Sequence, residues 1–155
     1  MVQEKIAKEL ICQVFIDTVN NYFHEITRIE SETGLPYLKD RNQQIIDDYT
    51  GMIGISGSRK GFVYVTSTRE LFGELVKIIL QIDEAKEEQI VDMAGEVANT
   101  VSGNVRQVFG SEFMISVPAI IEGKPKDLKF PDDVPVFVIP IKWKSYKANI
   151  VIGLE

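Results

Sequence analysis

With 155 residues, of which 45% are hydrophobic and 26% charged, the chain has the size and composition of a single globular domain with a substantial core. Its formal net charge of −6, with no basic block to offset it, argues against nucleic acid or an anionic membrane as a partner. A single cysteine, Cys12, and a single histidine, His24, exclude an internal disulfide and a zinc site of ordinary composition.

Nothing in the sequence points to a membrane or to the secretory route. The chain has no apolar run of about 18 residues, which a membrane-spanning helix requires. The stretch from Met1 to Leu10 carries charges and lacks the apolar core of a signal peptide. We therefore expect a cytoplasmic protein in which residues 1–155 form one domain.

The first predicted element is a helix from about Gln3 to Ile26. It has an apolar face, and the opposite face of its second half is polar. The apolar residues are Ile6, Leu10, Val14, Phe15, Val19, Tyr22, Phe23 and Ile26, and the polar ones are Gln13, Asp17, Asn20 and His24. The polar set follows the spacing i, i+4, i+7, i+11, which places it on one side of a helix. A solvated helix face is the simplest explanation of it.

The pattern then changes to loop and strand. Residues 30–48 show no periodicity and predict a loop with short extended pieces. Tyr49 to Ser56 and Gly61 to Thr66 predict a β-hairpin. A short helix follows, from about Arg69 to Gln81, with its N-cap within residues 66–68. Its predicted inward residues are Leu71, Leu75, Ile78 and Ile79.

The longest regular pattern predicts a helix from Glu87 to Phe109, with Asp83 as its cap. At about 100° per residue, this helix has two stripes on nearly opposite sides. The apolar stripe comprises Ile90, Ala94, Val97, Val101, Val105 and Val108, and the polar stripe comprises Asp92, Glu96, Asn99 and Gly103. If the apolar stripe faces the core, Glu96 and Asn99 point outward, one turn apart. A solvated face is again the simplest explanation.

Two glycines accompany the polar stripe. Gly103 continues it and Gly95 lies beside it, although a glycine within a helix costs about 1 kcal/mol relative to alanine. At these positions they leave bare backbone beside the carboxylate of Glu96 and the carboxamide of Asn99, where another protein could come close. Close helix packing within the chain would explain them equally well.

After the long helix the pattern returns to strands. Phe113 to Ile121 predicts an edge strand or an irregular strand, because it contains Pro118. The stretch from Lys124 to Asp133 is rich in proline and charge and predicts a loop.

The last part of the chain predicts a second hairpin, from Val134 to Trp143 and from Tyr146 to Leu154. Pro140 must then lie where no ladder donor is required. The order of elements predicts an α+β fold, with a mostly antiparallel sheet and long helices packed on one face.

The long helix and the segment after it resemble a known family. Asp92-x3-Glu96-x2-Asn99, followed about twenty residues later by Pro118, is similar to the signature of the CheC/CheX/FliY family of chemotaxis phosphatases. The wording Gly95-Glu96-Val97-Ala98-Asn99 with Gly103-Asn104, and Ser116-Val117-Pro118 leading to Glu122-Gly123, resembles the same family. The single motif and the short chain make CheX the most similar branch. One departure is that Pro118 follows Asn99 sooner than in the usual family spacing.

The resemblance implies a reaction and a partner. Proteins like CheX remove the aspartyl phosphate of the receiver protein CheY, whose own site holds Mg²⁺ and a lysine. By this resemblance Asn99 would orient the attacking water and Glu96 would pair with the receiver's lysine. Asp92, Gly95 and Gly103 would contact the receiver. The metal would belong to the receiver, so the resemblance implies no cofactor of this chain's own.

The residues themselves favour positioning over nucleophilic chemistry. No Ser-His-Asp or Cys-His set can be assembled, since the only histidine and the only cysteine share the first helix. A carboxamide such as that of Asn99 can orient a water for in-line attack, which is most of what phosphoryl transfer needs from a protein. Asp17 and Asn20 form a degraded version of the same motif, and we expect them not to be catalytic.

Two other interpretations stay open. The chain could be a receiver-binding or assembly module of the chemotaxis or flagellar system without catalysis. It could also form a homodimer through an exposed sheet edge, and the apolar last strands favour self-association. A homodimer is compatible with the phosphatase.

Overall fold

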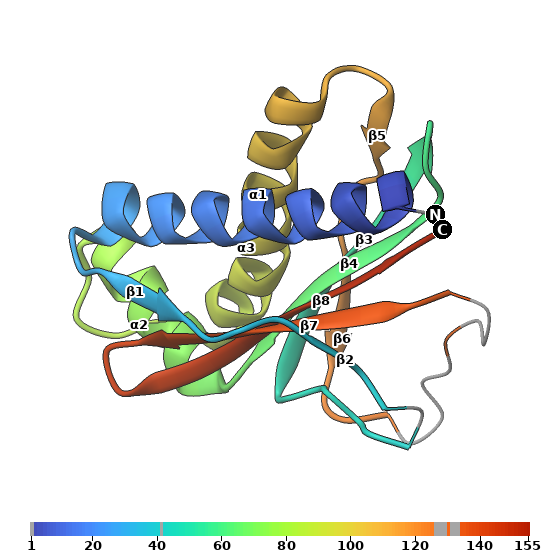
Figure 1. The fold of residues 1–155 in the computed structure, drawn as a ribbon. Coiled ribbons are helices and arrows are strands. Elements are labelled where there is room, and N and C mark those ends of the chain that lie inside the picture. The colour runs from blue at the N-terminus through green and yellow to red at the C-terminus, as the bar shows by residue number, and fades with distance from the viewer. Residues whose placement is uncertain (1, 41, 126–129, 131–133) are drawn as a thin grey trace.

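The computed structural model describes residues 2–40, 42–125, 130 and 134–155 (Figure 1). Within them the chain forms three helices and eight strands, which confirms the α+β prediction. The helices are α1 (Val2–Thr27), α2 (Arg69–Leu80) and α3 (Glu87–Phe109). The strands are β1 (Ser31–Thr33), β2 (Tyr37–Leu38), β3 (Tyr49–Gly57), β4 (Gly61–Ser67), β5 (Phe113–Ile115), β6 (Ala119–Glu122), β7 (Val136–Trp143) and β8 (Tyr146–Leu154).

The strands make one sheet in the order β1-β7-β8-β4-β3-β5, and each neighbouring pair is antiparallel. β2 continues along β7 beyond β1, and β6 pairs with β3 beyond β5. The last hairpin, β7 and β8, therefore lies inside the sheet. Its apolar composition follows from burial on both faces, so it is not the basis for self-association that the sequence indicates.

The helices cover one face of the sheet, with α1 crossing over α3 (Figure 1). The main core lies between these layers and includes Phe15 and Phe23 of α1, Leu75 of α2, Val97 of α3 and Trp143 of β7. A smaller apolar cluster lies on the far face of the sheet. It comprises Tyr64, Val136, Val138 and Val151, with Ile45, Met52, Phe62 and Phe130 packed against them.

The helix predictions hold in their extent and fail at particular residues. α3 has the predicted bounds, but Leu10, Ile26, Ile79 and Val108, all predicted to face the core, are 54%, 44%, 37% and 63% exposed. Ile26, Ile79 and Val108 lie near the ends of their helices, whereas Leu10 lies within α1. Figure 1 shows the last turns of α3 rising past α1. The side chain of Ile6 lies outside the described part of the chain.

The predicted N-cap is confirmed for α2 and wrong for α3. Thr68 is the N-cap of α2, and its hydroxyl accepts a hydrogen bond from the Leu71 N–H at 3.3 Å. The cap of α3 is Lys86, so the prediction of Asp83 is wrong. There the Gln89 side chain accepts a hydrogen bond from the Lys86 N–H at 2.8 Å, which satisfies a backbone donor at the start of the helix.

The loop predicted for residues 30–48 contains β1 and β2, the short extended pieces that were expected. Pro140 of β7 faces the gap between them, where no strand needs its missing N–H, and its carbonyl accepts a hydrogen bond from the Gly34 N–H at 2.9 Å. The loop predicted from Lys124 to Asp133 lies mostly outside the described residues.

Candidate functional site

The polar stripe of α3 faces outward, as its spacing predicts. Asp92, Glu96 and Asn99 are exposed and Gly103 is half-buried. The opposite side of the same helix is packed into the core through Ala94, Val97, Ala98, Val101 and Val105. The carboxylate of Glu96 and the carboxamide of Asn99 therefore stand on one accessible face, three residues apart.

The position of α3 is fixed by a close approach to β3. Gly51 of β3 lies so near the helix that an added Cβ would be 2.1 Å from the Ala94 carbonyl oxygen and 3.0 Å from the Ala98 Cβ. Since only glycine permits this contact, the helix backbone rests directly on the strand. The contact fixes the distance between the backbones of α3 and β3, and with it the position of the polar stripe relative to the sheet.

Gly95 corrects one expectation of the sequence. It is buried, and a Cβ added there would lie 3.2 Å from both Cδ1 and Cγ1 of Ile120 and 3.6 Å from the Pro118 Cβ. Its missing side chain thus makes room for residues of this chain at β6. At Gly103, by contrast, an added Cβ would meet nothing within 4 Å among the described residues, so the backbone there is open, and contact with a receiver stays a prediction.

The strand predicted from Phe113 to Ile121 is divided at Pro118 into β5 and β6. Ile115 pairs with Ile55 and Ala119 with Met52, so three residues of this edge stand against two of β3. The extra residue makes a β-bulge.

Ser116 closes the ladder across the bulge. Its N–H donates to the Gly54 carbonyl at 2.9 Å, and its hydroxyl oxygen accepts from the Gly54 N–H at 2.8 Å. The bulge is therefore held by hydrogen bonds that pair both backbone groups of Gly54.

The two flanks of the polar stripe are different elements. With about 100° per residue, Asn99 lies about 40° around the helix from Gly95, on the side of β6, and Glu96 lies about 100° from Gly95. On the other flank is α1. Burial raises the pKa of Tyr22 in α1 to about 12, and the negative charge of Glu96 adds to the rise. Glu96 therefore stands on the side of the stripe next to α1.

The polar side chains of α1 are engaged within the chain. Asn20 is half-buried and its Oδ1 accepts a hydrogen bond from the Ser31 hydroxyl at 2.7 Å. Gln13 donates to Asp17 at 2.9 Å, and His24 pairs with Glu30. Asn20 thus holds β1 against α1, which gives it a structural part in the fold.

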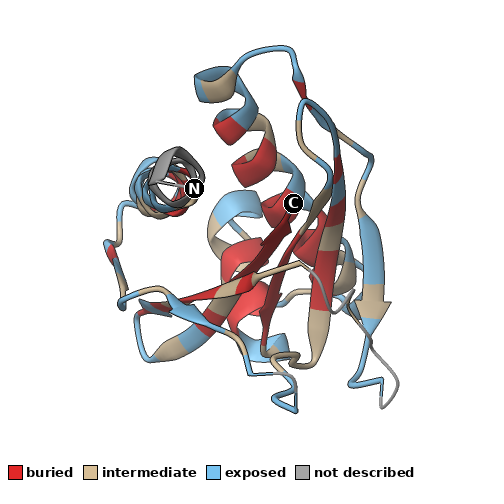
Figure 2. Ribbon diagram, turned by 45° about the vertical axis from the view of Figure 1, so that its right-hand side comes forward, coloured by how far each residue is buried: buried red, intermediate tan, exposed pale blue. Residues whose placement is uncertain are grey.

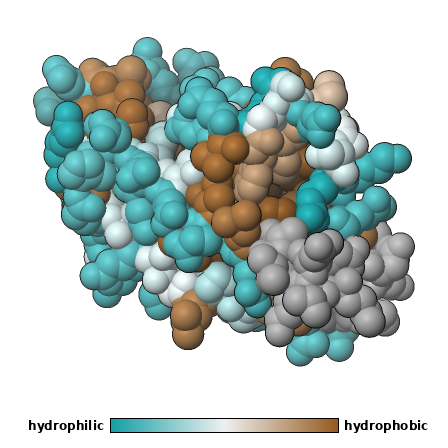
Figure 3. Space-filling model, turned by 45° about the horizontal axis from the view of Figure 1, so that its top comes forward, coloured by the Kyte–Doolittle hydropathy of each residue, from teal (hydrophilic) through white to brown (hydrophobic). Residues whose placement is uncertain are grey.

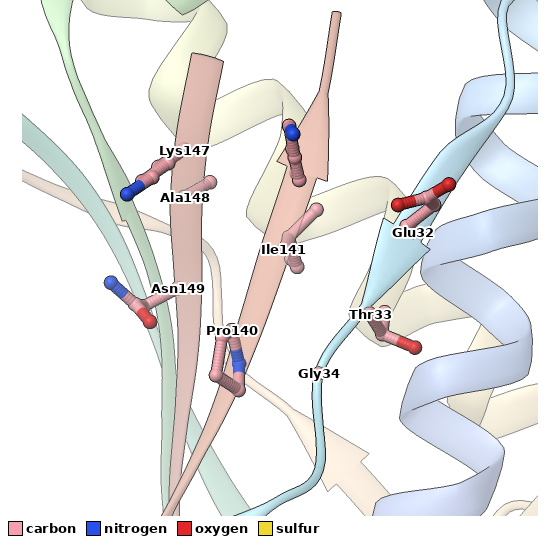
Figure 4. A pocket seen from close by; sticks show the side chains of 9 residues that line it. Glu32, Thr33, Gly34, Pro140, Ile141, Lys147, Ala148 and Asn149 are labelled. Atoms are coloured by element: carbon pink, nitrogen blue, oxygen red, sulfur yellow. The ribbon is translucent and has the colours of Figure 1, made fainter. Parts of the chain in front are cut away.

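Other hollows lie away from the predicted site residues. One of about 380 Å³ runs beside β1, β7 and β8, where Lys147, Asn149 and Glu32 line it (Figure 4). Another, of about 210 Å³, lies between the first half of α1 and the end of α3, lined by Leu10, Ile11, Ser58, Arg59, Phe109 and Phe113. Apolar atoms gather in the middle of that face in Figure 3. Neither hollow contains a residue of the polar stripe.

The chemistry of the stripe is that of a positioning surface. It offers one carboxylate and one carboxamide three residues apart, with a second carboxylate one turn earlier at Asp92. Within the described part of the chain, no group of three or more His, Cys, Asp or Glu side chains is arranged to hold a metal ion. No helix in that part is long and apolar enough to span a membrane.

Sequence reasoning did not find two neighbours of the site, Ile120 and Tyr22. Both contacts join elements distant in the chain, so helical periodicity carries no signal of them. Pro118 was the one residue of the motif that pointed to this segment. In the structure its Cβ lies 3.6 Å from the position that a Cβ on Gly95 would take.

Comparison with known proteins extends these observations. Residues 49–142 match the family model described as chemotaxis phosphatase CheX. A CheX structure from Desulfovibrio desulfuricans is 27% identical, covers 94% of this chain and 99% of its own, and has a TM-score of 0.81. No curated protein sequence gave a match.

More distant structures share the fold. A Vibrio vulnificus CheX is 22% identical over 94% of this chain and 99% of its own, with a TM-score of 0.80. The Borrelia burgdorferi CheX in a CheX–CheY–BeF3–Mg²⁺ complex is 20% identical over 93% of this chain and 97% of its own, with a TM-score of 0.75.

Proposed function

This chain belongs to the CheX family of chemotaxis phosphatases, and on that premise we propose that it hydrolyses the aspartyl phosphate of a CheY-type receiver domain. The observation that carries the proposal is the exposed stripe of α3, where Glu96 and Asn99 stand together on one accessible face. The Borrelia burgdorferi CheX complex contains CheY, which supports a receiver as the partner.

Asn99 positions the attacking water. Its carboxamide oxygen accepts a hydrogen bond from the water and directs it in line with the phosphorus–oxygen bond to the receiver's aspartate. The water oxygen bonds to phosphorus as that bond breaks, which yields the free carboxylate and inorganic phosphate. Both protons of the water go to the phosphate, which leaves as H₂PO₄⁻ and exchanges protons with the solvent. A loose transition state needs little covalent help, so correct placement supplies most of the acceleration.

Glu96 fixes the docked geometry. Its carboxylate forms an ion pair with the active-site lysine of the receiver, next to the phosphoryl group. Mg²⁺ bound by the receiver neutralises charge on the phosphoryl oxygens, so this chain needs no metal ligands of its own. Asp92 and Gly103 extend the contact along the same face of α3. CheY-type receivers act in the cytoplasm, where we place this chain.

The test is the decay of an acid-labile phosphoryl group on a CheY-type receiver from the same cell. The native chain should accelerate it, Asn99→Ala should lower kcat by about 100-fold, and Glu96→Gln should lower kcat/KM. A receiver that binds the native chain yet decays at its own rate would show a binding module instead of an enzyme. If the native chain neither binds the receiver nor accelerates its decay, the proposal is contradicted altogether.

A further inference from the structure

We propose that the β5–β6 edge carries a second part of the receiver-docking surface, an apolar shelf formed by Val117 and Ile120. The inference rests on the proposed function and assigns the shelf to the same receiver whose phosphoryl group meets Asn99. Its occupant is the surface of that receiver beside the phosphorylation site.

The shelf adjoins the polar stripe directly. Ile120 lies 3.2 Å from the position that a Cβ on Gly95 would take, and Gly95 is one turn before Asn99. Helical side chains lean toward the N-terminus of their helix, so the Asn99 side chain leans over the turn that contains Gly95. The carboxamide therefore lies within about one helical turn of Ile120, across the junction of α3 and β6.

The bulge presents Val117 to solvent. Ser116 is bound to Gly54 of β3, and the Pro118 Cβ lies against Gly95 of α3, so Val117 is the residue between two anchored neighbours. Its side chain is 85% exposed, and Ile120 is 38% exposed. Figure 2 shows this edge largely in the colour of exposed residues. A β-bulge beside a functional site commonly aims a side chain in this way.

The size of a protein interface requires a surface wider than the stripe. A specific complex buries about 800 Å² on each partner, which corresponds to a disc of about 16 Å radius. Gly95 is one helical turn from Asn99, Pro118 lies against Gly95, and Val117 is the residue next to Pro118. Each of these separations is a few ångströms, so Val117 lies inside a disc of that radius centred on Asn99.

The β5–β6 flank adds apolar area to a face that is otherwise polar. Val117 and Ile120 are exposed there, beside the carboxylate and carboxamide of the polar stripe. Specific interfaces combine apolar side chains with polar ones. The polar stripe and the shelf together therefore supply both kinds of contact.

The experiment compares Val117→Ser with Val108→Ser, a matched control. Val108 is also an exposed valine, at 63%, but it lies near the end of α3 and off the polar stripe. Each variant is titrated calorimetrically with a CheY-type receiver carrying Mg²⁺ and beryllofluoride, a stable mimic of the phosphoryl group. Its kcat and KM for receiver dephosphorylation are measured in parallel.

Val117→Ser should weaken binding about fivefold to tenfold and raise KM by the same factor with kcat unchanged, while Val108→Ser should match the native chain. If the native chain is active and Val117→Ser binds as it does, or if both valine variants weaken binding alike, the shelf is overturned and the phosphatase stands. If the native chain neither binds nor dephosphorylates a receiver, the proposed function fails and the shelf fails with it.

Discussion

Two glycines near the candidate site have opposite surroundings. Gly51 lies beneath the backbone of α3, and Gly103 faces open space on the polar stripe. The first is needed because the helix rests on β3 there. The second has no such contact with any residue that the structure describes, so a glycine there lowers helix stability without a packing benefit.

Gly51→Ala should lower the free energy of unfolding by about 3 kcal/mol, because its Cβ would meet the Ala94 carbonyl oxygen. Gly103→Ala should raise it by about 0.5–1 kcal/mol, because alanine favours the helix and its Cβ has room. Urea unfolding of both variants measures the two changes in unfolding free energy. Two equal changes would contradict the geometry, and a raised KM in Gly103→Ala would support close approach of the receiver there.

Tyr22 makes stability depend on alkaline pH. Its pKa in the folded chain is raised to about 12 from an ordinary value of 10.0, mainly by burial and further by Glu96. Above pH 10 the unfolded chain loses a proton that the folded chain still holds, so rising pH favours unfolding. The contribution of Tyr22 is thus complete below pH 10 and is lost as pH rises toward 12.

Tyr22→Phe should therefore flatten the decline of unfolding free energy between pH 10 and pH 12, relative to the native chain. Glu96→Gln should flatten it less, because the charge is the smaller of the two causes. Denaturant unfolding at several pH values measures both slopes. An unchanged slope in Tyr22→Phe would show that the phenol is not held in its neutral form.

Residue patterns could predict which α3 side chains face outward, because exposure follows from helical period alone. They could not predict the burial of Gly95, which depends on Ile120 reaching it from β6. The same holds for Asn20, whose amide is bound by Ser31 of β1. Such contacts are set by how distant elements meet.

At the scale of elements, the first turn of α3 is tied to α2 and β3 by one carboxylate. Glu87 accepts a hydrogen bond from Arg69 Nε at 2.8 Å, with Nη2 at 2.6 Å, and another from the Tyr49 hydroxyl. These bonds hold the pKa of Glu87 below its usual value, the larger effect coming from Arg69.

Glu87→Gln should therefore lower the melting temperature at pH 7, and the difference from the native chain should shrink as pH falls. A depressed carboxyl pKa contributes stability above the ordinary value of 4.5 and loses it as the group protonates below that value. Melting curves at pH 7 and pH 3 measure the difference. Because the pair is exposed, added salt should reduce it too, and a difference equal at both pH values would argue against the ion pair.

The boundaries of an element could be predicted where a single local feature of the sequence sets them. The length of α3 follows from an uninterrupted apolar period, and the break between β5 and β6 falls at Pro118. The cap of α3 was missed because Asp83 is a good capping residue by type, whereas Lys86 takes the position through its backbone and Gln89. A bulge of one residue leaves no mark on a sequence pattern.

At the scale of the molecule, the order of strands could not be predicted. The hairpins β3–β4 and β7–β8 are local, but the insertion of β8 between β4 and β7 joins residues far apart in the chain. The sheet consequently ends at β1 and β2 on one side and at β5 and β6 on the other.

We expect a homodimer, formed through the β1–β2 edge, because the β5–β6 edge borders the polar stripe. Leu35, Tyr37 and Leu38 expose 89%, 38% and 62% of their surface at that end, an unusual concentration of apolar groups on an edge. Light scattering should give twice the chain mass of 17.5 kDa for the native chain and a single mass for Leu38→Lys. A native chain that stays monomeric at high concentration would contradict this expectation.

We propose that Asn99 of α3 positions the attacking water and that the related Asn20 of α1 has no part in the hydrolysis. The most direct measurement is the rate of phosphoryl loss from a CheY-type receiver with Asn99→Ala and with Asn20→Ala, each checked for folding by circular dichroism. Asn99→Ala should fold and lose the acceleration, while any Asn20→Ala that folds should retain it. Activity kept in Asn99→Ala and lost in a folded Asn20→Ala would place the site on α1 and overturn the role proposed for Asn99.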